Sequence, residues 1–227
     1  VTLAEVFRRH GPAYLAKHAL SSAKAKVWRA IVACRTAILG GHVETCDGCG
    51  VTRHVYHSCR NRHCPQCQTR AKEHWLAKRR QELLPVPYFH LVFTLPHALH
   101  ALIGLRPRVI YEILFAAASA ALAEFAASPR WLGGKLAFSL VLHTWKQDLG
   151  RHVHVHALVA GGALTPAGEW KSPKRGFLFP VKALSRVFRG KFMARLSEAR
   201  GVGQPLAEAL ADDKVWRALR QQWLRHD

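Results

Sequence analysis

Five of the six cysteines in this 227-residue chain stand within 22 residues, and this cluster constrains the fold more than any other feature of the sequence. Two C-x-x-C pairs bound the cluster and are separated by 14 residues. Zinc in structural sites takes four soft ligands in a tetrahedron, and two such pairs on short turns supply them. We therefore predict a structural zinc ion held by Cys46, Cys49, Cys64 and Cys67. The alternative ligands between the pairs are Cys59 and His63.

The sixth cysteine, Cys34, stands 12 positions before the cluster, within an apolar stretch that we expect to be helical. We interpret it as a small core residue, because free cysteine packs as a small hydrophobe. A disulfide framework is disfavoured, since paired C-x-x-C spacing favours metal and we expect no secretory leader. The cysteine region has too little apolar core to fold alone, so its folding is expected to depend on the ion.

The chain is strongly basic, with 34 Lys and Arg against 14 Asp and Glu and a formal net charge of +20. This excess predicts a polyanionic partner, because neutralising phosphates releases condensed counterions. Nucleic acid is the leading candidate, and a solvated basic surface or an acidic membrane is the alternative. Basic residues are dense in and after the cysteine cluster, so we expect the zinc region to contact DNA and not to act only as a folding staple. The arginines assigned to this contact are Arg53, Arg60, Arg62, Arg70, Arg79 and Arg80.

The most hydrophobic stretch, residues 113–123, is bounded by Glu112 and Glu124. It falls short of the ~18 apolar residues that indicate a membrane span, so we expect a buried helix. We therefore expect no membrane association and a cytoplasmic, nucleoid-associated location. Charge alone would also suit RNA, but the sequence has no aromatic RNP-type motif.

The N-terminal part of the chain, residues 1–84, is predicted to be a helical and zinc-binding domain. Residues 2–39 read as helices: Thr2 and Glu5 fit a capping box, Gly11-Pro12 interrupts the run, and Ser21 or Ser22 begins a second segment that ends at Gly40-Gly41. The cysteine region covers residues 42–68. A basic helix follows over residues 69–84, and the prolines at 85 and 87 mark the domain boundary.

The second domain, residues 85–227, is predicted to be a small antiparallel sheet covered by helices, which makes the chain an α+β protein. We expect a strand over residues 88–95 and a helix over 98–127, interrupted at Pro107. Residues 135–145 and 152–160 are expected to form a β-hairpin. A loop over 166–180 and two helices over 181–200 and 205–226 complete the domain.

Alternating histidines mark the second strand of that hairpin. Side chains alternate along a strand, so His152, His154 and His156 share one face while Val153 and Val155 point to the other. Imidazoles on a rigid strand can fix a cation beside a phosphate, although the spacing alone predicts a metal site and not a reaction.

Four segments of the sequence, taken in order, resemble a known family. They are CRNRHCPQC at residues 59–67, FTLP at 93–96, HTW at 143–145 and HVHVH at 152–156. Together they resemble the rolling-circle HUH transposases of the insertion-sequence ninety-one type, and the resemblance covers nearly the whole chain. It implies a zinc-binding domain followed by an HUH endonuclease domain on a ferredoxin-like or RRM-like sheet. The function implied is metal-dependent nicking and strand transfer of DNA, with single-stranded or hairpin element ends as substrate.

The resemblance also implies roles for the histidines. His154 and His156 match the HUH pair and would hold magnesium or manganese, with His152 as a supporting partner. A third ligand is needed, and we expect Gln147, with Asp148 and His143 close by in the hairpin.

The family's nucleophile is a tyrosine on a helix after the HUH strand. The chain has four tyrosines, Tyr14, Tyr56, Tyr88 and Tyr111, and all of them precede His152. We therefore assign no catalytic residue and expect a truncated transposase that binds metal and DNA without forming a covalent adduct. The alternatives are a non-catalytic zinc-dependent DNA-binding regulator and, third, a replication initiator or relaxase.

Overall fold

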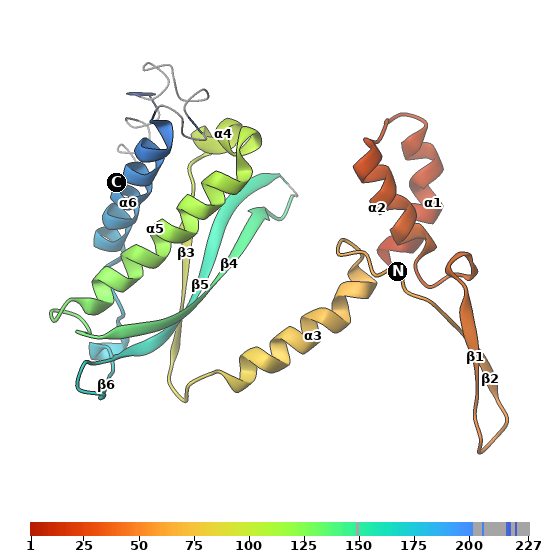
Figure 1. Cartoon of the computed structure of the whole chain (residues 1–227), viewed down its shortest axis with the longest axis horizontal. Helices are drawn as coiled ribbons and strands as arrows, with labels where there is room; N and C mark the ends of the chain where they lie inside the picture. The colour runs from red at the N-terminus through yellow and green to blue at the C-terminus, as the bar shows by residue number, and fades with distance from the viewer. Residues whose placement is uncertain (149, 202–205, 207–216, 219–220, 222–227) are drawn as a thin grey trace. The chain divides into compact units, whose positions relative to one another are not determined.

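The computed structural model describes residues 1–148, 150–201, 206, 217–218 and 221 (Figure 1). The chain divides into two compact units, Val1–Leu83 and Leu84–Asp227. The division lies one residue before the boundary expected at the proline pair. Leu84 precedes Pro85, and the residue before a proline is biased away from the helical region, which is consistent with α3 ending ahead of it.

The first unit begins with two helices, α1 (Leu3–Leu15) and α2 (Ser22–Ala33). The predicted capping box is present, because the Glu5 N–H donates to the Thr2 hydroxyl and the Thr2 N–H donates to the Glu5 carboxylate. Ser21 is the N-cap of α2. The two helices pack side by side and bury Ala4 and Ile31 between them and the cysteine loop.

Two predictions for this helical region are wrong. The first helix continues through Gly11 and Pro12, and Gly11 packs against Trp28 so closely that an added Cβ would lie 2.7 Å from the indole. The second helix stops at Ala33, well short of Gly40, because Cys34 has an extended backbone (φ −61°, ψ 126°) and Arg35 is left-handed (φ 56°). Cys34 is buried as expected, but it is the C-cap of the helix and not part of its interior.

The cysteine region forms a two-stranded hairpin that the sequence did not predict. Strands β1 (Gly41–Thr45) and β2 (Thr52–Tyr56) pair antiparallel, with His42 opposite Val55. The basic helix α3 (Pro65–Gln81) starts with proline at its first position, where a missing N–H costs nothing. It has no buried residue.

The second unit is built on an antiparallel sheet whose central strand carries the alternating histidines. Its strands are β3 (Tyr88–Thr94), β4 (Lys135–Trp145), β5 (Arg151–Leu164) and β6 (Trp170–Lys171). Strand β5 lies between β3 and β4, and β6 pairs with its far end. The predicted hairpin of β4 and β5 is confirmed. In chain order β5 is the third strand of this sheet, and it lies between the first two, β3 and β4. This is the ferredoxin-like arrangement that was expected.

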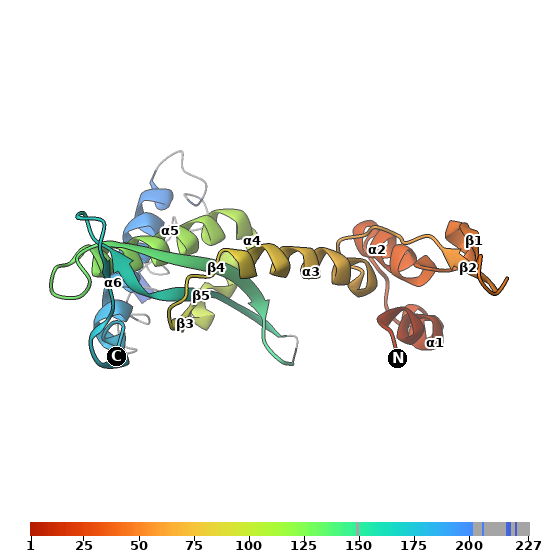
Figure 2. The ribbon, with the colours of Figure 1, turned by 90° about the horizontal axis from the view of Figure 1, so that it is seen from below.

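Helices cover one face of this sheet (Figures 1 and 2). They are α4 (His100–Leu105), α5 (Pro107–Ala127) and α6 (Val181–Arg200). Short 3₁₀ turns lie between successive elements inside each unit. They are Ala37–Leu39 in the first unit, and His97–Leu99 and Lys174–Gly176 in the second. The helix expected over residues 205–226 lies almost wholly outside the described residues.

The core of the second unit lies between α5, α6 and one face of β5. Val153, Val155, Ala157 and Val159 are fully buried on that face, as the alternation predicted for the first two. Helix α5 is long and apolar enough to cross a membrane, but half of its apolar window is buried, with Leu114 wholly inaccessible. It is the core helix of this unit, as expected.

Candidate metal centres

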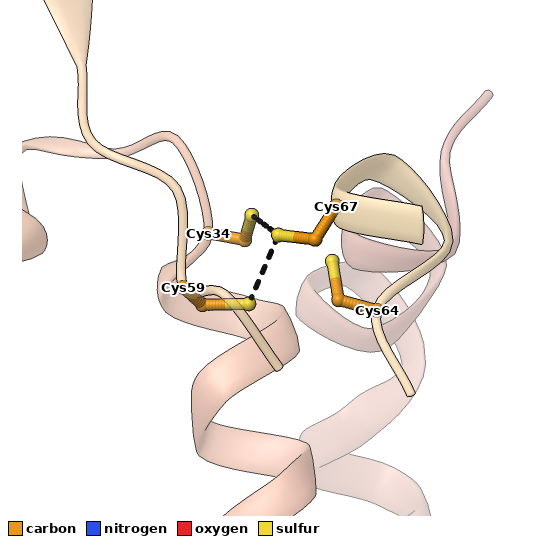
Figure 3. Close-up of side chains that lie close together, drawn as sticks. All are labelled: Cys34, Cys59, Cys64 and Cys67. Carbon is orange, nitrogen blue, oxygen red and sulfur yellow. Dashed lines mark hydrogen bonds between the residues drawn. The ribbon is translucent and has the colours of Figure 1, made fainter. Parts of the chain in front are cut away.

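Four thiols from three segments of the first unit converge (Figure 3). Cys34 caps α2, Cys59 follows β2, Cys64 is the N-cap of α3 and Cys67 lies in its first turn. The Sγ atoms of Cys34 and Cys59 each lie 3.6 Å from Sγ of Cys67, and all four sulfurs lie within 4.8 Å of one another. We call these residues the four-thiol group.

The dimensions of the four-thiol group fit a tetrahedral zinc ion. Zinc–sulfur bonds of about 2.3 Å place the sulfurs of a tetrahedron about 3.8 Å apart, close to the observed separations. Backbone N–H groups of Cys59, Asn61 and Arg60 donate to the sulfurs of Cys34, Cys59 and Cys67 respectively. Such donors stabilise thiolates, the form that binds metal. The left-handed backbone at Arg60 (φ 49°) belongs to the turn that presents these N–H groups.

Burial and hydrogen bonds between the thiols shift the pKa values of Cys34, Cys59 and Cys67 in different directions. Burial raises the pKa of Cys34 and raises that of Cys59 to about 12. Burial also opposes ionisation of Cys67, but hydrogen bonds from Cys59, Cys34 and Cys64 outweigh it and lower the pKa of Cys67 to about 7. Cys67 is therefore the thiol that ionises first near neutral pH.

Cys46 and Cys49 lie outside the four-thiol group, at the exposed tip of the β1–β2 hairpin. Five-residue strands span about 17 Å, which separates the tip from the loop that carries Cys59. A hydrogen bond from the Cys49 thiol, helped by the N–H groups of Cys49 and Gly48, lowers the pKa of Cys46. The structure thus differs from the predicted ligand set: it groups two of the four expected cysteines with Cys59 and Cys34. His63 is exposed beside Arg62 and is not in the group.

Three histidines converge on the face of the sheet opposite α5. His154 pairs directly with His143 of β4, and His156 lies two residues along on the same face. Ring centroids of His143 and His156 are 4.3 Å apart, and one nitrogen from each of the three rings lies within 4.8 Å of the others. This three-histidine group meets the ligand count and spacing of a cation site, and its donors are imidazole nitrogens.

Hydrogen bonds orient two of these rings for binding. Nδ1 of His154 lies 3.0 Å from the His152 carbonyl oxygen, which only accepts, so Nδ1 carries the proton and Nε2 has a free lone pair. Nδ1 of His156 lies 2.7 Å from Nε2 of His90, and the two rings stack at 7°. If Nδ1–H of His156 donates to His90, Nε2 of His156 is also left as a lone-pair nitrogen.

The environment favours the neutral form of His156, one of the three histidines. Burial, with the nearby rings of His143, His154 and His90, lowers the pKa of His156. Burial also lowers the pKa of His152 and of His100. A neutral imidazole is the metal-binding form, so the shift at His156 favours ligation at neutral pH.

Comparison with known proteins identifies the family. Residues 6–95 match the family described as transposase zinc-binding domain, and residues 137–226 match the family described as putative transposase. The chain belongs to the IS91-type transposases.

Two curated relatives of this IS91-type chain are transposases by name. A putative transposase, y4qJ, of Sinorhizobium fredii is 49% identical over 199 residues, which cover 87% of this chain and 50% of the relative. The transposase for insertion sequence element IS801 of Pseudomonas savastanoi pv. phaseolicola is 32% identical over 195 residues, covering 83% of this chain and 45% of the relative. The chain spans about half the length of these relatives.

Among solved structures, the conjugative relaxase TrwC in complex with oriT DNA, in its metal-bound form, matches with a TM-score of 0.39 and 19% identity. The match covers 48% of this chain and 42% of the relaxase. The metal-free structure of the same relaxase in complex with oriT DNA matches with the same TM-score and 18% identity.

The arginines expected to contact DNA fall into two classes in this IS91-type chain. Arg53 forms an ion pair with Glu44, and Arg79 pairs with Glu82, so part of their charge is already neutralised. The exposed side chains of Arg60, Arg62, Arg70 and Arg80 have no ion pair with a carboxylate among the described residues.

At the histidine site, His143 was named from the sequence only as a neighbour of Gln147, and His90 was not named at all. The third nitrogen comes from His143, whereas Gln147 lies in the exposed turn. The predicted hairpin, with residue 145 opposite 152, already implied that 143 faces 154. His90 had no such signal, because its strand is distant in sequence and its register was unknown. His152 supports the group through its backbone carbonyl.

Proposed function

We propose that this chain holds a divalent cation against a phosphate of single-stranded DNA, for the nicking and strand transfer of rolling-circle transposition. The observation that carries the proposal is the three-histidine group on the open sheet face, with its rings already oriented by the His152 carbonyl and by His90. The family supports DNA as the substrate. A preformed cation site favours this function over a non-catalytic DNA-binding regulator.

The three histidines are the proposed ligands of the ion. His143, His154 and His156 offer one nitrogen each, and the remaining positions around the ion are for water and a phosphate oxygen. When bound, magnesium or manganese would polarise the phosphoryl oxygen and stabilise the leaving 3′ oxygen. Three nitrogen donors suit manganese better than magnesium, which prefers oxygen ligands.

The zinc-binding unit is proposed to hold the DNA strand. We propose Cys34, Cys59, Cys64 and Cys67 as the zinc ligands, because only these four thiols lie at tetrahedral distances among the described residues. Arg60 and Arg62 lie between two of the ligands and are therefore presented rigidly beside the ion. The basic helix α3 starts at the same ligands and carries Arg70 and Arg80 to the phosphates.

The two tyrosines of the second unit, Tyr88 and Tyr111, are unsuited to attack a phosphate at the histidine site. Tyr88 pairs with Ala160, four residues along β5 from His156, and its hydroxyl accepts the Leu84 N–H. Tyr111 packs against the core from α5. We therefore propose that these 227 residues bind metal and DNA but form no 5′-phosphotyrosyl adduct. Association with the nucleoid would follow from this DNA binding.

The test is the coupling between manganese and single-stranded DNA. We expect manganese to tighten binding of a labelled single strand in fluorescence anisotropy, and the coupling to vanish in His154→Ala and His156→Ala. Gln147→Ala is the matched control and is expected to keep the coupling. Equal affinity with and without manganese in the unaltered chain refutes the proposed placement of the phosphate, and a covalent protein–DNA band on a denaturing gel refutes the absence of a nucleophile.

A further inference from the structure

A groove between α1 and α2 is lined by none of the residues of the two candidate metal sites. Its volume is about 640 Å³, within the range of small-ligand sites, and its lining is mainly apolar. Aromatic side chains Phe7, Tyr14 and Trp28 line it together with His10 and His63.

The aromatic residues of the groove form a row of nearly parallel rings. Trp28 stacks on Phe7 with centroids 4.0 Å apart and planes at 6°, and Tyr14 follows at 6.0 Å and 9°. His18 lies next to Tyr14 at 4.5 Å. The row depends on Gly11, because any side chain there would displace the indole. Phe7 packs against the small core of this unit, but Tyr14 is 47% exposed, so core packing does not account for that end of the row.

The surroundings of the row are cationic. Residues 1–33 contain six Lys and Arg against a single Glu, and Lys24 lines the groove itself. His63 enters the lining from the loop of the four-thiol group, where Arg62 hydrogen-bonds to it. An apolar, ring-lined slot with a positive rim is complementary to a nucleobase attached to a phosphate backbone.

We propose that the α1–α2 groove binds an unpaired base of single-stranded DNA, stacked against the Phe7–Trp28–Tyr14 row, while the surrounding cations contact the adjacent phosphates. The inference rests on the proposed function, which supplies single-stranded DNA as the partner. Stacking tolerates any base, so the groove would contribute affinity for unpaired DNA without sequence selection. Duplex DNA keeps its bases paired and would gain nothing from this groove.

The test compares ring-bearing and ring-free side chains at position 14. Tyr14→Leu keeps an apolar residue but removes the ring, Tyr14→Phe keeps the ring, and Phe177→Leu removes an exposed ring from the other unit. Zinc-loaded protein without manganese is titrated with a single strand, with the same strand containing abasic sites, and with duplex. We expect Tyr14→Leu to bind the single strand about tenfold more weakly, with abasic DNA and duplex unaffected.

The outcomes separate this inference from the proposed function. Unchanged single-strand affinity in Tyr14→Leu overturns the groove proposal, while the manganese coupling at the histidines is measured independently and decides the other. Loss of affinity in Tyr14→Phe as well would assign the effect to the hydroxyl and overturn stacking. If Tyr14→Leu instead changes the mass measured by light scattering without DNA, the groove binds a second copy of the chain and the proposal fails.

Discussion

Replacing Cys34 by serine tests the most specific difference between the sequence-based zinc site and the structure. Cys34 stands 12 residues before the cysteine cluster, yet its sulfur lies 3.6 Å from that of Cys67. Cys46, a member of the predicted ligand set, lies at the exposed hairpin tip. Cys34→Ser and Cys46→Ser remove the same atom from the same residue type, so they form a matched pair.

The expected effect follows from the number of ligands. Structural zinc binding in small domains has an apparent free energy of about 10–16 kcal/mol, which is about 2.5–4 kcal/mol for each of four ligands. Loss of one thiolate is therefore expected to weaken zinc binding by about two to three orders of magnitude. Cys34 is only 2% exposed, so water cannot readily substitute for its sulfur.

The measurement is zinc competition with a chromophoric chelator, joined by cobalt substitution. Four thiolates give an intense sulfur-to-cobalt absorption band, and Cys34→Ser is expected to reduce it by about a quarter. Cys46→Ser is expected to leave both the band and the affinity unchanged. If Cys46→Ser loses zinc while Cys34→Ser retains it, the assignment of the four-thiol group is wrong.

Three further predictions concern the histidine site. His143→Ala is expected to weaken manganese binding about 100-fold in paramagnetic-resonance titrations, whereas Gln147→Ala changes nothing; the reverse pattern would restore the glutamine as ligand. His90→Phe keeps the stacked ring but removes the nitrogen that hydrogen-bonds to Nδ1 of His156, so affinity should fall about tenfold and recover in His90→Gln; no loss in the phenylalanine variant would exclude this support. The pKa of His156 is lower in the folded chain than in the unfolded chain, so the unfolded chain binds more protons below about pH 6.5. The thermal midpoint of the metal-free protein should therefore fall as the pH drops from 7 to 5. A rise of the midpoint in calorimetry would contradict this.

The sequence predicted elements whose pattern is set locally. The capping box at Thr2 and Glu5, the β4–β5 hairpin and the helix over residues 181–200 follow from neighbouring residues, and the structure has all three. The break expected at Gly11-Pro12 failed because tertiary packing overrides propensity: Trp28 packs on Gly11 and holds the helix together across the proline.

The sites were harder to predict than the fold, because their ligands come from segments that only the tertiary structure brings together. The cysteine spacing identified a zinc region, but the hairpin carries Cys46 away from the loop while the end of α2 brings Cys34 in. The alternating histidines identified His154 and His156, since period two is a local property of a strand. His90 comes from a strand 66 residues away, and no local pattern fixes the register between them.

The two units differ in what stabilises them, and this separates the roles that we propose for the two metals. The first unit buries a small cluster, Ala4, Ile31, Cys34 and Cys64, in which two of the four members belong to the four-thiol group. The second unit buries a continuous apolar core against the face of β5 opposite the site histidines. We therefore expect the fold of the first unit to depend on the proposed zinc ion, whereas the three-histidine group lies on a sheet with its own apolar core. Removal of zinc is therefore expected to weaken DNA binding while the three histidines keep their arrangement.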